Sequence, residues 1–423
     1  MNILLIGSGG REHALSTAIA KNPDLDTLYV APGNAGIAQI ATCISLDTSN
    51  HEAIIDFCKT SNIDFVMIGP EAPLVDGLHD SLKDAGILSL GPSKGASQLE
   101  GSKAFTKMIC DKYHIPTAAY EKFTQSEPAK AYAAKQSFPL VIKADGLAAG
   151  KGVIIAQDLE EANTTIEAML GEKQFGDASS TIVIEEFLDG EEISFFALSD
   201  GNMVLPFGSA QDHKRAFDGD KGPNTGGMGT YSPAPIMTDD LHHRIMQDTI
   251  IPLVNGMKTE GIPYQGVVFA GFMVKNGEPK LLEINVRFGD PETQVLMSRL
   301  NSDLLTLLIA AAKGNLGAQT VTMKDDAALC VVMAANGYPG SYTKGTIIEG
   351  IEESTHDDVI IFHAGTDIDD NGNIIAIGGR VLGVTATAPT VKEAQTKAYQ
   401  CIDSINWPEG FCRRDIGWRA VGQ

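Results

Sequence analysis

A carboxylate, an amide and a guanidinium alternate with apolar residues between positions 281 and 287. Successive side chains of a strand point to opposite faces, so Glu283, Asn285 and Arg287 would share one face. Carboxylate and amide oxygens suit Mg²⁺, which takes few protein ligands and keeps waters and substrate phosphates. A neighbouring arginine suits a phosphate or an oxygen that gains negative charge. The segment predicts a site for phosphate chemistry; the alternative is an edge strand with a solvated polar face.

A glycine-rich loop follows a predicted strand that carries Lys143. It contains Gly146, Gly150, Lys151 and Gly152. Exposed backbone N–H groups in such a loop can hold phosphate oxygens. The spacing is not that of a Walker loop, because no helix follows at once. The alternative is a flexible hairpin with a solvated lysine.

An apolar run from 182 to 184 ends in Glu185 and Glu186. On a strand these two side chains point to opposite faces, so at least one faces an interior. A buried carboxylate needs a donor or a cation. A ligand amine, sugar hydroxyls or a structural lysine would serve, and the strand alone favours the lysine.

Residues 208–233 have little apolar content and include Asp212-His213-Lys214-Arg215 and Gly226-Gly227-Met228-Gly229. Long structureless loops in compact domains are usually functional or disordered. The basic residues and glycines favour a substrate loop, in which His213 is either structural or catalytic. Arg380, Arg413 and Arg414 are basic positions to which the sequence assigns no chemistry.

The N-terminal segment Gly7-x-Gly9-x-x-Glu12 is a weak match to a dinucleotide-binding turn. The third glycine is missing, and no acid follows the second predicted strand to hold a ribose. A glycine turn at the start of a helix remains a general anion site. The alternative is a turn that only allows close packing of strand and helix.

Apolar and helical patterns alternate over residues 1–93, which predicts a doubly wound parallel sheet. The predicted strands are 2–6, 27–31, 64–68 and 88–90, and the helices are 12–21, 52–59 and 78–85. A long helix is expected over 97–113 and a compact α+β unit over 120–190, with strands 139–144, 152–156 and 181–187 and a helix over 160–170. Residues 320–423 predict a small β-rich domain with one helix over 391–405.

The 423 residues are enough for about three domains. The net charge of −22 argues against nucleic acid or an anionic membrane as a partner, but allows a local basic site for a small phosphorylated substrate. Six scattered cysteines predict free thiols in a reducing cytoplasm, and the N-terminus predicts a first strand, not a signal peptide.

Taken in order, these segments resemble the glycinamide ribonucleotide synthetase family of the ATP-grasp enzymes. The matching segments are 7–13, 69–74, 143–153, 211–215, 222–229 and 285–294, with 415–420 near the end. The resemblance implies an ATP-grasp architecture: an N-terminal α/β domain over 1–100, an ATP-grasp domain over 101–310 with a small lid over 118–190, and a C-terminal domain over 320–423.

The resemblance also implies a reaction, the ATP-dependent ligation of glycine to 5-phosphoribosylamine through glycyl phosphate in purine biosynthesis. ATP would be a co-substrate and Mg²⁺ or Mn²⁺ the metal, held by Glu283 and Asn285. The enzyme would be a cytoplasmic monomer acting on small molecules, with no nucleic-acid or membrane partner.

Further roles come from the same resemblance. Arg287, Asp212 and Lys214 would be catalytic. The nucleotide would be held by Lys103, Lys143, Gly146, Gly150, Lys151, Gly152, Glu185, Glu186, Leu188 and Glu192. The other substrates would be held by Gly9, Gly10, Gly226, Gly227, Met228, Asp290, Pro291, Glu292 and Thr293. Gly227 would allow close approach of glycine, and Met228 would be a wall of its site.

Three other functions remain open at this point. A related ATP-grasp carboxylase or formyltransferase would share the nucleotide site, but segments 212–215 and 290–294 argue against it. A dinucleotide-dependent oxidoreductase lacks the acid after the second strand. A catalytically silent nucleotide-binding protein would have no need of the Glu283, Asn285 and Arg287 face.

Overall fold

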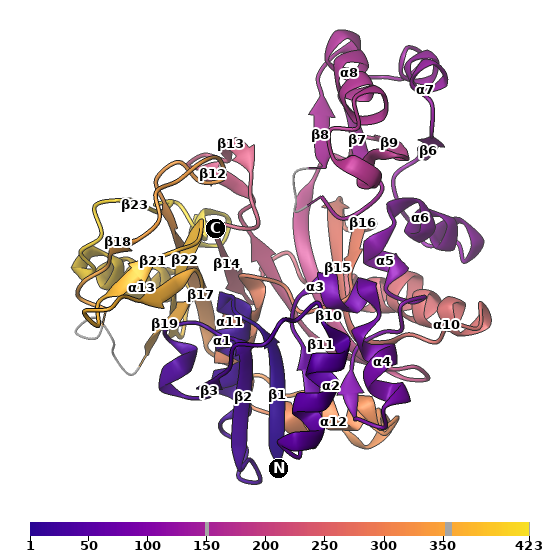
Figure 1. The fold of residues 1–423 in the computed structure, drawn as a ribbon. Coiled ribbons are helices and arrows are strands. Elements are labelled where there is room, and N and C mark those ends of the chain that lie inside the picture. The colour runs from indigo at the N-terminus through magenta and orange to yellow at the C-terminus, as the bar shows by residue number, and fades with distance from the viewer. Residues whose placement is uncertain (149–151, 352–357, 423) are drawn as a thin grey trace.

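The computed structural model describes residues 1–148, 152–351 and 358–422 (Figure 1). A five-stranded sheet forms the N-terminal region, in the order β3-β2-β1-β4-β5, and all its strand pairs are parallel. Its strands are β1 (Asn2–Gly7), β2 (Thr27–Pro32), β3 (Thr42–Cys43), β4 (Phe65–Ile68) and β5 (Ser89–Leu90). Its helices are α1 (Gly10–Ile19), α2 (His51–Thr60), α3 (Glu71–Asp76) and α4 (Leu78–Asp84). The predicted doubly wound sheet is confirmed.

The single helix predicted over 97–113 is wrong, because the structure contains two helices there. These are α5 (Gln98–Gly101) and α6 (Lys103–Lys112), separated by Ser102 in an extended conformation. The Ser102 hydroxyl accepts the Phe105 N–H at 3.1 Å and caps α6. It also donates to the Asp145 carboxylate at 3.0 Å, and Asp145 accepts the Ala104 N–H at 2.7 Å. A contact across 41 residues therefore fixes the helix start, which a local pattern does not reveal.

The described residues between Tyr120 and Glu186 form a separate lobe, a four-stranded antiparallel sheet with helices α7 and α8, which we call the lid. Figure 1 shows it standing away from the rest of the molecule, at the top in magenta. Its strands are β6 (Tyr120–Phe123), β7 (Leu140–Ala144), β8 (Val153–Ala156) and β9 (Ile182–Glu186), in the order β6-β9-β7-β8. Its helices are α7 (Ser126–Ala133) and α8 (Leu159–Ile166); a π-helical turn over Glu167–Gly171 ends the predicted helix 160–170. Ala129, Ile142 and Ile166 belong to its own apolar core.

A nine-stranded sheet runs through the rest of the molecule, and its path is β16-β15-β10-β11-β14-β17-β22-β19, with β23 on β17. The strands are β10 (Glu191–Asp200), β11 (Val204–Asp212), β14 (Gly229–Ser232), β15 (Gln265–Lys275), β16 (Glu278–Asn285), β17 (Ala327–Ala335), β19 (Val359–His363), β22 (Arg380–Ala388) and β23 (Gly410–Phe411). The helices are α9 (Asp239–Ile245), α10 (Ile251–Thr259), α11 (Glu292–Arg299), α12 (Leu304–Ala312), α13 (Val391–Ser404) and α14 (Trp418–Val421).

Pairing of β14 with β17 carries this sheet into the C-terminal region, which is β-rich as predicted. A small sheet of β18 (Thr346–Ile347), β21 (Ile374–Ala376) and β20 (Thr366–Ile368) lies beyond it. The predicted domain boundaries stay predictions. Among the described residues, no helix is long and apolar enough to cross a membrane.

Residues 208–233 are not the structureless loop that their composition predicts. They contain the end of β11, a hairpin of β12 (Arg215–Phe217) and β13 (Lys221–Asn224), and β14. The pairing that orders β14 is distant, since Gly229 lies opposite Val331 of β17. Polar strands of this kind gain their order from partners far along the chain, which explains why composition alone fails.

Candidate active site

A cavity of about 670 Å³ lies between the lid, β15, β16, α6 and the loops at the carboxyl ends of β1 and β4. Many of the predicted site residues line it: Lys103, Lys143, Gly152, Glu185, Glu186, Leu188, Glu192, Lys214, Gly226, Glu283, Asn285, Arg287, Asp290 and Glu292. Other predicted site residues do not line it: Gly9, Gly10, Gly146, Asp212, Gly227, Met228, Pro291 and Thr293. Gly150 and Lys151 lie outside the described residues.

Two lysines share one oxygen of Glu185 at the lid end of the cavity. Lys143 Nζ lies 2.9 Å from Glu185 Oε2, and Lys107 Nζ lies 3.3 Å from the same atom. Glu185 Oε1 is buried and has no hydrogen-bond partner. Burial lowers the pKa of Lys107, although Glu185 opposes that shift. The arrangement supplies positive charge and leaves one buried carboxylate oxygen free to accept from a ligand.

Lys103 of α6 and Glu186 of β9, which also have predicted nucleotide roles, are held differently. Lys103 Nζ donates to the Gly146 carbonyl at 3.4 Å, so this lysine touches the start of the glycine loop. The Glu186 carboxylate accepts the Ala119 N–H at 3.0 Å and binds Lys280 at 2.9 Å. The side chain of Glu186 is therefore already paired within the protein. Its partner is a structural lysine, the kind of partner that the sequence of this strand favoured.

Glu283 and Asn285 present oxygens to the cavity from the end of β16. Burial would raise the pKa of Glu283, but Lys214, Lys143 and Lys103 hold it below its ordinary value, which keeps the carboxylate charged. Asn285 Oδ1 accepts from Arg287 at 3.2 Å and retains a second lone pair, and Asn285 Nδ2 is buried without a partner.

These donors fit a hard divalent cation whose shell is completed by phosphates and water. No group of three or more His, Cys, Asp or Glu side chains among the described residues could hold a metal by itself. A metal at Glu283 and Asn285 would therefore depend on oxygens that a bound ligand brings.

Arg287 follows β16 and connects three parts of the chain. Its Nε lies 2.9 Å from Glu71 Oε2, and its Nη2 lies 3.2 Å from Glu100 Oε1. Its Nη1 donates to the Phe288 carbonyl at 3.1 Å. Glu71 comes from α3 of the N-terminal sheet and Glu100 from α5, so the guanidinium is fixed in place where it borders the cavity.

A second cluster of charged side chains on the cavity wall surrounds Lys214, in which Asp212 is buried and Lys214 and Glu192 are about one-third exposed. Lys214 Nζ lies 3.3 Å from Asp212 Oδ2 and 3.4 Å from Glu192 Oε1. Burial raises the pKa of Asp212 to about 7, although Lys214 opposes the shift, and burial also raises the pKa of Glu192. Glu292 lies nearby and accepts from the Ser194 hydroxyl at 3.0 Å. Lys214 reaches the cavity, whereas Asp212 lies behind it.

The predicted role of Met228 as a wall of the glycine site is wrong, because its side chain is buried in the main apolar core. Gly227 does not line the cavity either, but it has φ +112° and is closely surrounded. A Cβ atom there would lie 2.5 Å from Pro291 Cδ and 2.8 Å from Asp212 Oδ1. Glycine is needed at 227 for close packing within the protein.

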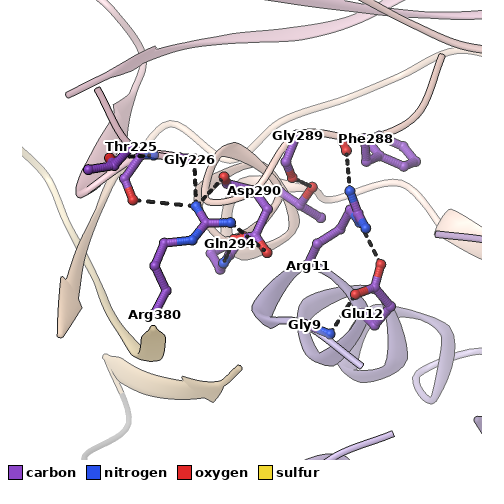
Figure 2. Close-up of polar contacts among 12 residues, drawn as sticks. Gly9, Arg11, Glu12, Thr225, Gly226, Phe288, Gly289, Asp290, Gln294 and Arg380 are labelled. Carbon is purple, nitrogen blue, oxygen red and sulfur yellow. Dashed lines mark hydrogen bonds and ion pairs between the residues drawn. The ribbon is translucent and has the colours of Figure 1, made fainter. Parts of the chain in front are cut away.

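Arg380 from β22 reaches the cavity, although the sequence assigned it no chemistry. Figure 2 shows its guanidinium between the Gly226 segment and Asp290. Arg380 Nη1 donates to the Asp290 carbonyl at 2.6 Å and to the Gly226 carbonyl at 2.5 Å, and Nη2 lies 3.5 Å from Asp290 Oδ2. Burial would raise the pKa of Asp290, but Arg380 holds it below its ordinary value.

Protein carboxylates already occupy the N-terminus of α1, which the sequence predicts as an anion site. Glu12 Oε2 accepts the Gly9 N–H at 2.7 Å, and Arg11 donates to Glu12 and, at 3.2 Å, to the Phe288 carbonyl (Figure 2). A Cβ on Gly10 would lie 2.6 Å from Gln294 Nε2. The glycine turn therefore allows α1 to approach α11 closely, which is the packing alternative.

Sequence reasoning missed five charged residues that line the cavity: Arg11, Glu71, Glu100, Lys107 and Arg380. Glu71 had a usable signal, because it follows a predicted strand at the edge where ligands bind in parallel sheets. Lys107 and Arg380 had none, because a lysine on a helix and an arginine on a strand are ordinary surface residues.

The sequence matches three consecutive domain families: phosphoribosylglycinamide synthetase N domain over residues 1–100, its ATP-grasp (A) domain over 101–293 and its C domain over 328–419. A phosphoribosylamine–glycine ligase of Mesorhizobium japonicum is 55% identical over 423 residues, covering 100% of this chain and 99% of the relative. The ligase of that name from Escherichia coli K12 is 51% identical, with 100% and 99% covered.

Solved structures give the same assignment. The Thermotoga maritima phosphoribosylamine–glycine ligase has a TM-score of 0.86 and 34% identity, with 98% of this chain and 100% of that chain covered. A biotin carboxylase of Campylobacter jejuni, 16% identical with a TM-score of 0.75 over 98% of this chain and 93% of its own, shares the fold. The chain belongs to the phosphoribosylglycinamide synthetase family and contains its ATP-grasp domain.

Proposed function

We propose that this enzyme ligates glycine to 5-phosphoribosylamine at the expense of ATP, yielding glycinamide ribonucleotide, ADP and phosphate in purine biosynthesis. The observation that carries the proposal is one continuous cavity, which joins a lysine-rich nucleotide end at the lid to a charged end at Lys214, Asp290 and Arg380. Full-length identity above one half to ligases of that name supports it.

The first step is transfer of the γ-phosphoryl group of ATP to glycine. A glycine carboxylate oxygen bonds to the γ-phosphorus, the bond to the β-phosphate oxygen breaks, and ADP and glycyl phosphate form. Such a transfer needs alignment and charge neutralisation more than covalent help. Lys143 and Lys103 contact phosphates, and Glu185 Oε1 accepts from the nucleotide. Glu283 and Asn285 would hold Mg²⁺ or Mn²⁺, which would supply neutralisation of the phosphate charge.

The second step is attack of the phosphoribosylamine nitrogen on the carbonyl carbon of glycyl phosphate. A C–N bond forms, the C–O bond to phosphate breaks, and the proton lost by the nitrogen passes to the departing phosphate. Arg287 faces the negative oxygen that develops on the carbonyl carbon. Lys214 borders this end of the cavity, and Asp212 acts through it as a positioning residue. Asp290, Glu292 and Gly226 line the wall that receives the amine substrate.

ADP release tests the activity directly, with glycine and phosphoribosylamine each omitted in turn. Release that requires both substrates supports the ligase, and release that bicarbonate or formate sustains in place of glycine supports the carboxylase or formyltransferase alternative. Glycine labelled with ¹⁸O in its carboxylate tests the intermediate. One ¹⁸O atom must appear in phosphate, and phosphate without label would exclude glycyl phosphate.

The remaining proposals concern the state of the enzyme. We propose a cytoplasmic monomer that acts on small molecules and binds neither nucleic acid nor membrane, as the net charge of −22 favours. Light scattering after size exclusion tests the monomer, because a mass of twice 44.9 kDa would contradict it.

A further inference from the structure

The last residues of the chain hold the segment that carries Lys214. His213 is fully buried, its Nδ1 lies 3.0 Å from the Gly229 carbonyl, and its Nε2 accepts the Gly417 N–H at 3.2 Å. The ring is therefore neutral, with Nδ1–H as donor and Nε2 as acceptor. Burial, aided by the charge of Arg413, lowers the pKa of His213 to about 4, which agrees with this assignment. His213 is structural, and one of its two partners lies 204 residues away.

Arg413 is the largest contributor to this attachment. Its side chain has 0% exposure, and its Nη1 lies 2.9 Å from Asp220 Oδ1 and donates to the Arg215 carbonyl at 3.1 Å. Its Nε and Nη2 each bind an Asp415 oxygen at 2.8 Å, a two-point contact that fixes the plane of the guanidinium. Arg215 begins β12, and Asp220 lies in the turn between β12 and β13.

Three more contacts join the same two segments. The Asp415 carboxylate accepts the Gly219 N–H at 2.8 Å, and Asp218 accepts the Arg414 N–H at 2.8 Å. Arg419 Nη2 lies 2.6 Å from Asp220 Oδ2. Residues 213–220 are thus attached to residues 413–419 at His213, at Arg215 and at the turn 218–220, and Figure 1 shows the hairpin strands β12 and β13 in the same part of the molecule as β14.

The attached segment supplies one side of the cavity. Lys214 enters it directly, and the Lys214 carbonyl accepts from the backbone and the hydroxyl of Thr225, at 2.8 and 2.9 Å. Thr225 and Gly226 also line the cavity. A shift of the hairpin would therefore move Lys214 and the 224–226 wall together.

We propose that Arg413 is a positioning residue for the charged end of the cavity, where glycine and phosphoribosylamine would react. It holds Lys214 and residues 224–226 in place through Asp220 and the Arg215 carbonyl. The inference rests on the proposed ligase activity. The lysine-rich end of the cavity is held by other contacts, the ion pairs of Glu185 with Lys143 and Lys107. Loss of the Arg413 contacts therefore lowers the use of glycine and phosphoribosylamine and leaves nucleotide affinity in place.

The test compares Arg413→Met with Arg414→Met. Arg414 is the neighbouring residue and its side chain is exposed. It forms an ion pair with Asp403 at 2.7 Å and lies over the Tyr399 ring, and neither of these partners is a hairpin residue. Arg413→Met is expected to lose about 100-fold in kcat/KM for phosphoribosylamine and glycine, since a displacement of about 1 Å has that effect. Affinity for a non-hydrolysable ATP analogue should match that of Arg414→Met, and Arg413→Lys should recover only part of the loss.

Asp220→Asn provides a second variant in case Arg413→Met does not fold. Asp220 has φ +54°, a conformation that asparagine tolerates well, so this change removes the charge and keeps the turn. It should also lose kcat/KM for glycine and phosphoribosylamine without losing nucleotide affinity. Its amide hydrogens over residues 213–225 should exchange faster than those of the unaltered protein.

Each outcome either supports or overturns the positioning role of Arg413. The inference is overturned if either folded variant has the same kcat/KM for glycine and phosphoribosylamine as Arg414→Met. It is also overturned if affinity for the ATP analogue falls together with that kcat/KM. If the unaltered enzyme releases no ADP with both substrates present, the proposed function fails. The exchange measurement still judges the attachment in that case: faster exchange over 213–225 supports it and unchanged exchange overturns it.

Discussion

The Arg287 guanidinium binds the Glu71 carboxylate at 2.9 Å, joining residues 216 positions apart. This contact connects the strand that carries the proposed metal ligands to the N-terminal parallel sheet. The arginine is held by Glu71, Glu100 and the Phe288 carbonyl together, so its position is set before any substrate binds. An arginine fixed in this way can stabilise a developing negative oxygen without reorganising during the reaction.

Arg287→Lys should lower kcat by about 10²–10³, the effect of losing one fixed donor to a developing oxyanion. A lysine cannot reproduce several contacts with one point charge. Steady-state kinetics measure the loss, and Arg244→Lys, at an exposed arginine paired with Glu278, is the matched control. Unchanged kcat in Arg287→Lys would remove the proposed role.

Glu283→Gln should lower metal-dependent turnover by at least about 100-fold, or 2.7 kcal/mol, because the metal loses a charged ligand. The fold should persist, since the side chain opens into the cavity. Turnover measured against Mg²⁺ concentration gives the result, and Asn285→Ala should behave alike. Glu278→Gln on the same strand is the control, and normal turnover of Glu283→Gln at saturating Mg²⁺ would exclude Glu283 from the site.

Gly227→Ala should destabilise the protein more than Gly277→Ala does. Gly277 has φ +77° with no atom within 4 Å of an added Cβ, so it reports the backbone cost alone, about 1–2 kcal/mol. Gly227 adds the contacts with Pro291 and Asp212. Denaturant unfolding compares the two variants, and equal losses would show that the contacts relax freely.

Glycine use should also change in Gly227→Ala, because displacement of Asp212 reaches the cavity through Lys214. The glycine KM should rise while ATP-analogue affinity stays constant. A fall in nucleotide affinity with an unchanged glycine KM would place this segment at the nucleotide instead.

Stability should fall as pH drops below about 6.5, and His13 should account for part of the loss. Burial, aided by the charge of His363, lowers the pKa of His13 to about 3, and its Nδ1 accepts the His363 N–H at 2.8 Å. The folded state therefore holds the His13 ring neutral. The stability that depends on this neutral ring is complete above pH 6.5 and is lost as the pH falls toward 3. At pH 5.5 the loss is about 1.4 kcal/mol for one such histidine.

Urea unfolding at pH 7.5 and 5.5 checks this in His13→Gln. The free energies of unfolding at the two pH values should differ by about 1.4 kcal/mol less than in the unaltered protein. His243→Gln, at an exposed histidine, should leave the difference unchanged. An equal pH dependence in all three proteins would assign the effect to other groups.

The sequence by itself determined the features that depend on neighbouring residues. Alternating apolar and helical patterns predicted the parallel sheet, because strand and helix periods are local. The spacing of Glu283, Asn285 and Arg287 brought three polar groups to one cavity wall, although the strand ends at Asn285. Family resemblance in the quoted segments gave the ATP-grasp architecture and the ligase reaction.

Only the tertiary structure decided which polar groups meet across long stretches of chain. Ser102 ends a helix pattern because Asp145 binds it, Met228 lies in the core because β14 pairs with β17, and Arg380 borders the cavity because β22 lies in the same sheet. Arg413 resembles a surface arginine until Asp220 is placed beside it. Such ion pairs and strand pairings leave no periodic trace in sequence, because their partners are chosen by the fold as a whole.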